Sequence, residues 1–230
     1  MAVDRLVLWD IDKTLLSVGG VGTEAFGAAF EELTGASMRE MADAVGRTER
    51  HILRRTIELH DLDPNDYSFD RFAALEAAEY RARVEQIRMR GSVLPGARSA
   101  LAALGRLPHI LQTVLTGNTR EGAEAKLDAF GLVGLDLHIG AYGDLSEYRP
   151  DLVPVARSLA ERRSGKNYAG ERTVIIGDTE HDIAAAREHG ARVIAVATGL
   201  ATRAELERAG ADIVLPDLSG TMALLAHIGG

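Results

Sequence analysis

Nearly continuous apolar runs recur along the chain, and several of them stop abruptly at a polar residue or a glycine. The runs span residues 6–9, 110–115, 173–176, 193–196 and 213–215. A strand that is buried on both faces has this pattern, because neither face has to be polar. The runs therefore predict a parallel β-sheet that is covered on both sides.

Helical periodicity fills most of the segments between these runs. Apolar residues recur there at spacings of three and four, which places them on one face of a helix. The predicted helices span residues 96–104, 120–130, 152–162, 183–189 and 203–209. Strands that alternate with helices are typical of an α/β fold with a Rossmann-like parallel sheet.

The pattern changes between the first and second predicted strands. Helical spacing dominates there, and no strand is evident; the apolar positions are Phe26, Phe30, Leu33, Ile52, Leu53, Ile57, Phe69, Phe72 and Leu75. Glycine-rich segments at 19–22 and 91–96 flank this region and suit hinges or tight turns. We predict an α/β core formed by residues 1–16 and 92–230, and an inserted, all-helical cap formed by residues 17–91.

Composition narrows the classes of function. The formal net charge of −8 argues against a nucleic-acid partner, because binding to phosphate backbones depends on a basic surface. The absence of cysteine excludes disulfides, thiolate metal sites and cysteine nucleophiles. The N-terminus lacks the order of a secretory signal, and no apolar run approaches the roughly 18 residues of a membrane span. We expect a cytoplasmic enzyme without a membrane partner; the sequence leaves its oligomeric state open.

Polar residues stand directly after three of the predicted strands. Asp10, Thr116 and Asp178 follow the first, second and third runs. Each is also an ordinary turn or helix-capping residue, but ligands of open parallel sheets bind beyond the carboxyl ends of the strands. Asp12 brings a second carboxylate close to Asp10, and two such groups stay ionised together only with a compensating cation or a shared proton. This pairing favours a metal ion.

The same residues resemble the motifs of the haloacid dehalogenase-like superfamily. Residues 10–14 match its first motif, Asp-x-Asp-x-Thr, with Lys13 at a position where Gly is usual. Thr116, at the end of the second core strand, matches the second motif. Residues 177–182 match the fourth motif, and Asp178 and Asp182 stand four apart, which we expect to place both on one face at the start of a helix. The resemblance spans nearly the whole chain and includes its phosphoglycolate phosphatase and β-phosphoglucomutase branch.

This resemblance implies a mechanism. Asp10 would attack phosphorus to form an aspartyl-phosphate, and Asp12 would act as general acid and then as general base. Mg²⁺ would be bound by the Asp10 carboxylate, the Asp12 backbone carbonyl and Asp178, with Asp182 as a further ligand or support. Thr116 would donate a hydrogen bond to the phosphoryl group.

Further binding residues are expected on both sides of the site. Asn118, with Glu121 three residues later, reads as a helix N-cap, so that backbone N–H groups after Thr116, near Gly117 and Asn118, would face a phosphate. In the cap, Arg47 and Thr48 belong to a Gly-Arg-Thr segment that resembles the substrate-contacting turn of related phosphatases. A cap arginine can equally be a solvated surface charge.

The third motif, normally a lysine that neutralises charge on the nucleophile, has two candidates. Arg149 is the direct positional match, just before the helix that leads to the fourth motif. Lys126 lies about two turns along the helix after Thr116, roughly 10 Å from its phosphate-binding end. We favour Arg149 over Lys126, whose other possible role is that of a solvated helix lysine, and both stay candidate catalytic residues.

Together these features predict a Mg²⁺-dependent phosphatase that acts on a small phosphorylated metabolite. A phosphomutase keeps the same residues and is the main alternative. A haloacid dehalogenase has no need of a metal or of an acid at Asp12, and a noncatalytic phosphate-binding regulator would not need the intact acidic motifs.

Overall fold

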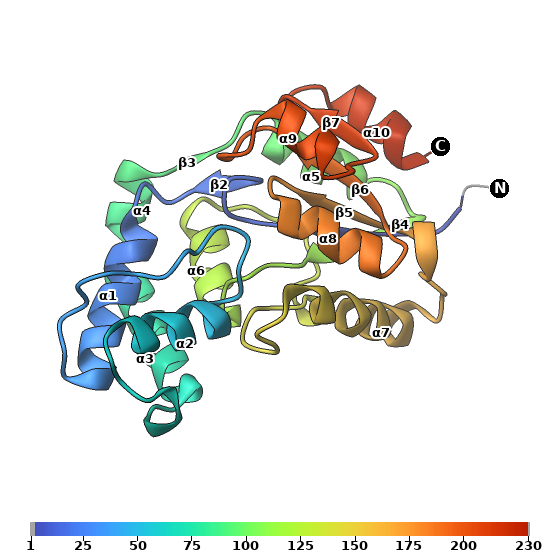
Figure 1. Cartoon of the computed structure of the whole chain (residues 1–230). Coiled ribbons are helices and arrows are strands. Elements are labelled where there is room, and N and C mark those ends of the chain that lie inside the picture. Colours follow the sequence, from blue (N-terminus) through green and yellow to red (C-terminus); the bar gives the residue numbers. More distant parts are fainter. Residues whose placement is uncertain (1–2, 230) are drawn as a thin grey trace.

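The centre of the molecule is a five-stranded, all-parallel β-sheet (Figure 1). The structure, a computed structural model, describes residues 3–229, so the predicted core residues 1–2 and 230 lie outside the described part. The strands run in the spatial order β4-β1-β5-β6-β7. Their bounds are Arg5–Trp9 for β1, Ile110–Val114 for β4, Thr173–Gly177 for β5, Arg192–Val196 for β6 and Ile213–Leu215 for β7. All five predicted strands are confirmed.

Alternate side chains of each strand enter two separate hydrophobic clusters. Val7 and Trp9 of β1 pack into one cluster, and Leu6 and Leu8 pack into the other. The first cluster includes residues of α5, α6 and α10, and the second includes residues of α7, α8 and α9. Helices therefore cover both faces of the sheet, as the unbroken apolar runs predicted. The α/β fold class is confirmed.

The helices of this core follow the predicted alternation. Their bounds are Ala97–Leu104 for α5, Arg120–Ala129 for α6, Leu152–Ser164 for α7, Glu180–Glu188 for α8, Arg203–Arg208 for α9 and Thr221–Gly229 for α10. Short 3-10 helices span Pro64–Asp66, Leu137–Ile139, Arg149–Asp151 and Gly170–Arg172. The periodicity analysis missed α10, which closes one face of the sheet through Leu224 and Ile228. None of the helices in residues 3–229 is long and apolar enough to cross a membrane.

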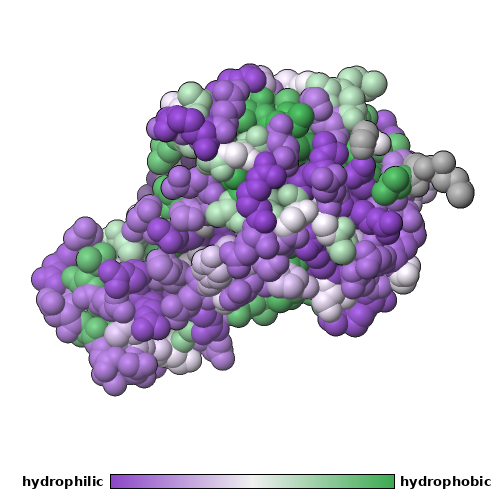
Figure 2. Space-filling model, turned by 45° about the vertical axis from the view of Figure 1, so that its right-hand side comes forward, coloured by the Kyte–Doolittle hydropathy of each residue, from purple (hydrophilic) through white to green (hydrophobic). Residues whose placement is uncertain are grey.

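Four α-helices form the inserted region between β1 and α5, to the left of the sheet in Figure 1. Their bounds are Val21–Thr34 for α1, Glu49–Leu59 for α2, Phe69–Ala82 for α3 and Val84–Arg90 for α4. A third hydrophobic cluster holds α1, α2 and α3 together; Phe26 and Phe72 meet edge to face in it, with ring centroids 4.9 Å apart. The outline of this helical cap as a second, smaller lobe is visible in Figure 2.

Two short strands join the cap to the core. Leu16–Ser17 (β2) and Ser92–Val93 (β3) pair antiparallel and form a separate two-stranded sheet. Two-residue strands leave no alternation in the sequence, so the pattern analysis could not detect them. They lie across the predicted limits at residues 16–17 and 91–92, and the division into 1–16, 17–91 and 92–230 stays a prediction.

Candidate active site

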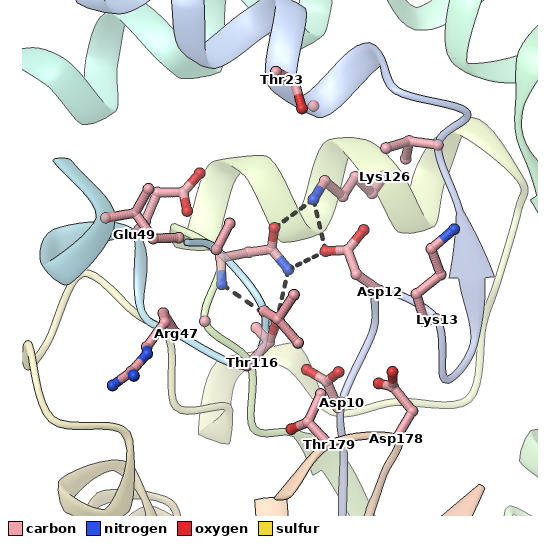
Figure 3. A pocket seen from close by; sticks show the side chains of 18 of the residues that line it. Asp10, Asp12, Lys13, Thr23, Arg47, Glu49, Thr116, Lys126, Asp178 and Thr179 are labelled. Atoms are coloured by element: carbon pink, nitrogen blue, oxygen red, sulfur yellow. Dashed lines mark hydrogen bonds and ion pairs between the residues drawn. The ribbon is translucent and has the colours of Figure 1, made fainter. Parts of the chain in front are cut away.

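The carboxyl ends of three neighbouring strands meet at one edge of the sheet. Because β1 lies between β4 and β5, Asp10 is flanked by the residues that follow those two strands, Thr116 and Asp178. The Asp10 N–H donates to the Ile176 carbonyl at 2.8 Å, which continues the strand pairing to the start of the site. A cavity of about 350 Å³ opens here between core and cap, and Asp10, Thr116 and Asp178 line it (Figure 3).

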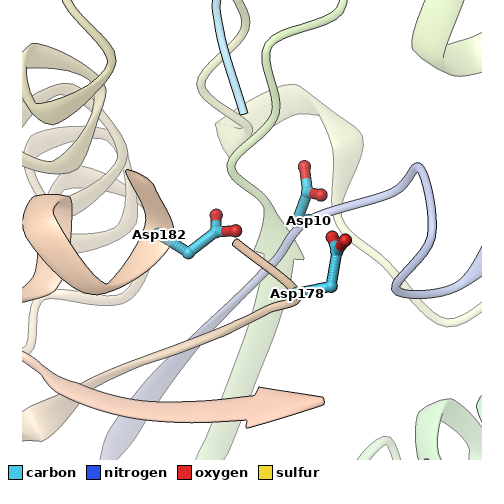
Figure 4. A group of neighbouring side chains, drawn as sticks. All are labelled: Asp10, Asp178 and Asp182. Atoms are coloured by element: carbon cyan, nitrogen blue, oxygen red, sulfur yellow. The ribbon is translucent and has the colours of Figure 1, made fainter. Parts of the chain in front are cut away.

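Three buried carboxylates converge beside this cavity (Figure 4), and those of Asp10 and Asp178 line it. Oxygens of Asp10, Asp178 and Asp182 lie within 4.8 Å of one another. Burial raises the pKa of Asp10 to about 7, although Arg149 opposes this shift. Burial, reinforced by the Asp10 carboxylate, raises the pKa of Asp178 to about 8. Ionised together, these groups carry more negative charge than one arginine offsets, and their oxygens suit a hard divalent cation.

Arg149 places positive charge next to Asp10. It begins the 3-10 helix that precedes α7, is buried, and donates from Nη2 to Asp10 Oδ1 at 2.9 Å and to Asp182 Oδ1 at 2.5 Å. Burial by itself would lower the pKa of Arg149, but the carboxylates of Asp182 and Asp10 raise it, so the guanidinium stays charged. This contact fits the predicted third-motif role.

Asp182 is held by the start of α8. Thr179 is the N-cap, and a capping box joins it to Asp182, whose Oδ2 accepts from the Thr179 N–H at 3.1 Å and from its hydroxyl at 2.6 Å. Asp178 precedes the helix, so our expectation that both carboxylates share a face of one helix is wrong. They converge because the turn after β5 and the first turn of α8 approach the same point.

Lys126 and Asn118 bind the second carboxylate of the first motif. Lys126 Nζ lies 2.7 Å from Asp12 Oδ2, and Asn118 Nδ2 donates to the same oxygen at 2.8 Å (dashed lines in Figure 3). Asn118 also donates to Thr116 Oγ1 at 2.7 Å and accepts from Lys126 at 2.5 Å. Lys126 is only 4% exposed and is therefore not a solvated helix lysine.

A model of the haloacid dehalogenase-like hydrolase family matches residues 7–196. The chain belongs to this family. It is 28% identical over 228 residues to a phosphoglycolate phosphatase of Cupriavidus necator, covering 95% of this chain and 92% of that protein. It is 29% identical over 227 residues to the probable phosphatase IndB of Dickeya dadantii, covering 93% and 90%. The predictions of the superfamily and of a phosphatase are confirmed.

Solved structures of the same fold span the whole chain. A hydrolase from Pseudomonas syringae superposes with a TM-score of 0.68 and 21% sequence identity over 99% of this chain and all of that one. This likeness covers the helical cap as well as the sheet. The inserted cap is therefore part of the shared fold.

One departure from the motif of this hydrolase family has a structural explanation. Lys13, which occupies the usual glycine position, has a φ of 62°, in the left-handed region that glycine adopts without strain. The Lys13 N–H donates to the Leu16 carbonyl at 2.8 Å and the ammonium to Ser17 Oγ at 3.0 Å, which hold the turn. The turn also brings Thr14 Oγ1 to 3.2 Å from Asp178 Oδ1.

The N-cap of α6 is Thr119 and not Asn118, which corrects our expectation. The Thr119 hydroxyl accepts from the Gly122 N–H at 3.2 Å. The Asn118 side chain instead points into the site, where it donates to Asp12 and Thr116 and accepts from Lys126. Hydrogen bonds to the charged Asp12 and Lys126 are stronger than a bond to a backbone N–H group. That backbone N–H groups after Thr116 face a phosphate stays a prediction.

The cap residues of the Gly-Arg-Thr segment have different surroundings. Arg47 lines the cavity, but in Figure 3 its guanidinium points away from Asp10 and Asp12. Thr48 is fully buried and outside the cavity wall; it is the N-cap of α2 and donates to the Glu147 carbonyl at 3.0 Å. Substrate contacts for both residues stay predictions.

Gly117 joins the cap to the core. Its carbonyl accepts from the Glu49 N–H at 2.7 Å, and a Cβ at this position would lie 1.9 Å from the Arg47 carbonyl oxygen. Any larger residue would therefore push the cap away from the site. Gly117 also lines the cavity, which agrees with the predicted substrate contact without testing it.

Sequence reasoning missed the acidic and aromatic residues of the cap wall. Glu49 and Tyr80 line the cavity, and Glu76 lies buried behind them. Phe72, Glu76 and Tyr80 recur every four positions on α3. A glutamate in an otherwise apolar stripe was the signal that could have revealed this group.

Proposed function

We propose that this phosphatase hydrolyses a small phosphate monoester through an aspartyl-phosphate on Asp10, with Mg²⁺ as cofactor. The observation that carries the proposal is the separation of two carboxylates in one cavity. Asp10 contacts Arg149 and lies beside the carboxylates of Asp178 and Asp182. Asp12, two residues later, contacts Lys126 and Asn118. Different surroundings suit a nucleophile and a separate acid–base group. The names of the two relatives agree with this reaction.

The reaction follows from these positions. A carboxylate oxygen of Asp10 attacks phosphorus, and the bond between phosphorus and the ester oxygen breaks while protonated Asp12 gives its proton to that oxygen. Asp12 then takes a proton from water, whose oxygen attacks phosphorus; the bond between phosphorus and the Asp10 oxygen breaks, which releases inorganic phosphate and restores the Asp10 carboxylate. Lys126 and Asn118 both bind Oδ2 of Asp12 and so hold its carboxyl group in one orientation.

The acidic cluster fits the proposed metal site. Asp10, Asp178 and Asp182 offer the carboxylate oxygens, and the Asp12 backbone carbonyl stays a predicted ligand. When bound, Mg²⁺ would neutralise the nucleophile and the phosphoryl oxygens. Thr116 and Arg149 would contact the phosphoryl group and the nucleophile from the core side. A cytoplasmic location stays a prediction from the sequence.

Phosphate release should require a divalent cation. In excess chelator we expect almost no phosphate release from p-nitrophenyl phosphate or from a panel of phosphorylated metabolites. Without a cation, the ionised carboxylates of Asp10, Asp178 and Asp182 repel one another and also repel the negatively charged substrate. Added Mg²⁺ should restore turnover and raise the melting temperature, since a ligand that binds only the folded state stabilises it.

The matched variant is Asp178→Asn. In this variant added Mg²⁺ should restore less turnover and should raise the melting temperature less than in the parent protein. Full turnover in chelator would overturn the proposed metal role. A phosphomutase is the alternative reaction on the same residues; transfer of the phosphoryl group to a second hydroxyl, with little release to water, would identify it.

Asp12→Asn should impair poor leaving groups selectively. We expect a loss on the order of 10²–10⁴ for an alkyl phosphate and a much smaller loss for p-nitrophenyl phosphate, because general acid catalysis matters most for a basic leaving oxygen. Lys126→Met should show the same selectivity more weakly, since it frees the Asp12 carboxylate to rotate. The measurement is kcat/KM on both esters, and equal losses would count against the acid role.

A further inference from the structure

The cap side of the cavity carries a pair of buried glutamates that the proposed reaction does not use. Glu49 and Thr23 line the cavity and lie above Asp10 and Asp178 in Figure 3, on the cap side toward which the alcohol part of an ester bound at Asp10 would extend. Apolar residues of the same cap wall include Val18, Met41 and Ile52.

A second acidic side chain, Glu76, lies behind Glu49 in the cap wall. Glu76 is completely buried; its Oε2 accepts from the Thr119 hydroxyl at 3.1 Å, and its Oε1 has no donor among the described residues. The Glu49 carboxyl group adjoins it, and burial together with Glu49 raises the pKa of Glu76 well above its usual range. The two carboxyl groups can hydrogen-bond only if one of them is protonated.

Positive charge on this side of the cavity is already engaged. Lys126 donates to Asp12 and Asn118, and the Arg47 guanidinium points away from Asp12 in Figure 3. No lysine or arginine among residues 3–229 forms an ion pair with Glu49, so its carboxyl group lines the cavity without a direct cationic partner. A carboxylate on the substrate would meet like charge here in a site of low dielectric, whereas an O–H or N–H donor would find an acceptor.

Resting on the proposed function, we infer that Glu49 makes the enzyme selective for small phosphate monoesters whose alcohol part carries a hydrogen-bond donor, a hydroxyl or an ammonium, and disfavours esters that carry a carboxylate. The cavity volume of about 350 Å³ lies at the lower end of the range for small-molecule sites, which suits a small alcohol part. The carboxylate-bearing compound 2-phosphoglycolate is therefore expected to be a poor substrate.

The test compares kcat/KM for glycerol 3-phosphate, phosphoethanolamine and 2-phosphoglycolate with Mg²⁺ present, and p-nitrophenyl phosphate serves as the reference ester. For the parent enzyme we expect at least one donor-bearing ester to exceed 2-phosphoglycolate by about tenfold or more, the scale of one charged hydrogen bond. The first two esters distinguish a hydroxyl from an ammonium as the preferred donor.

Glu49→Gln should reduce this ratio by about tenfold, mainly through KM, because the amide keeps the size and removes the charge. Glu49→Asp, which keeps the charge but shortens the side chain, should fall between the two. Glu58→Gln, on the same helix in an exposed ion pair with Arg54, is the matched control and should keep the parent ratio.

The outcomes separate the two proposals. Two results overturn the role of Glu49 alone, provided that the enzyme releases phosphate from p-nitrophenyl phosphate. One is that Glu49→Gln leaves the ratio of kcat/KM between the donor-bearing ester and 2-phosphoglycolate unchanged. The other is that the parent enzyme prefers 2-phosphoglycolate. No Mg²⁺-dependent release from any of the four esters overturns the proposed function and this selectivity with it.

Discussion

Asp10→Asn should abolish phosphatase turnover, with a loss of at least about 10⁴-fold, while the protein stays folded. Removal of a nucleophile elsewhere costs about 10⁶, and an amide of nearly equal size is a far weaker nucleophile than a carboxylate. The amide oxygen of the variant can still accept from Arg149, whose Nη2 lies 2.9 Å from Asp10 Oδ1 in the parent protein. The measurement is steady-state phosphate release, together with a search for a phosphorylated protein by intact mass.

Stability provides the control for this variant. Removing one of three converging carboxylates relieves repulsion from Asp178 and Asp182, so the metal-free variant should be at least as stable to urea as the parent. Asp151→Asn, which changes an exposed carboxylate that accepts from Ser146, should keep full turnover. A folded Asp10→Asn protein with parental rates would show that another group attacks phosphorus.

Arg149→Ala should lose about 10²–10³ in turnover at saturating Mg²⁺, the scale for removing one preorganised charge-stabilising group. The variant leaves Asp10 and Asp182 buried without their cation, and we expect about 3–5 kcal/mol of destabilisation in chelator. Arg149→Lys should recover part of the turnover, because an ammonium restores the charge but not the planar fork that spans both carboxylates.

Lys126→Ala gives the decisive comparison. Its ammonium contacts Asp12 and not Asp10, so its loss should be larger for alkyl than for aryl phosphates, whereas Arg149→Ala should impair both alike. Arg203→Ala, which removes an exposed ion pair with Glu207, controls for the loss of an arginine. A large, leaving-group-independent loss for Lys126→Ala with a near-normal Arg149→Ala would reverse the assignment of the third-motif cation.

Local patterns alone determined the sheet and the positions where its strands end. Strand burial is visible in consecutive apolar residues, and a parallel sheet aligns the carboxyl ends of its strands, so these patterns suffice to place Asp10, Thr116 and Asp178 at one edge. Helical spacing similarly revealed the inserted cap. Short elements such as β2 and β3, and α10 near the C-terminus, carry too little periodicity to be recognised this way.

Tertiary structure decided which charged groups meet. Lys126 was judged by its distance along α6 from the phosphate-binding end, but the helix lies so that its side chain reaches Asp12, and Asn118 then turns inward and leaves capping to Thr119. The Glu49–Glu76 pair likewise depends on how the start of α2 packs against the middle of α3. Contacts between elements depend on how helices pack against one another, and hydrophobic spacing specifies the buried face of a helix without specifying its neighbours.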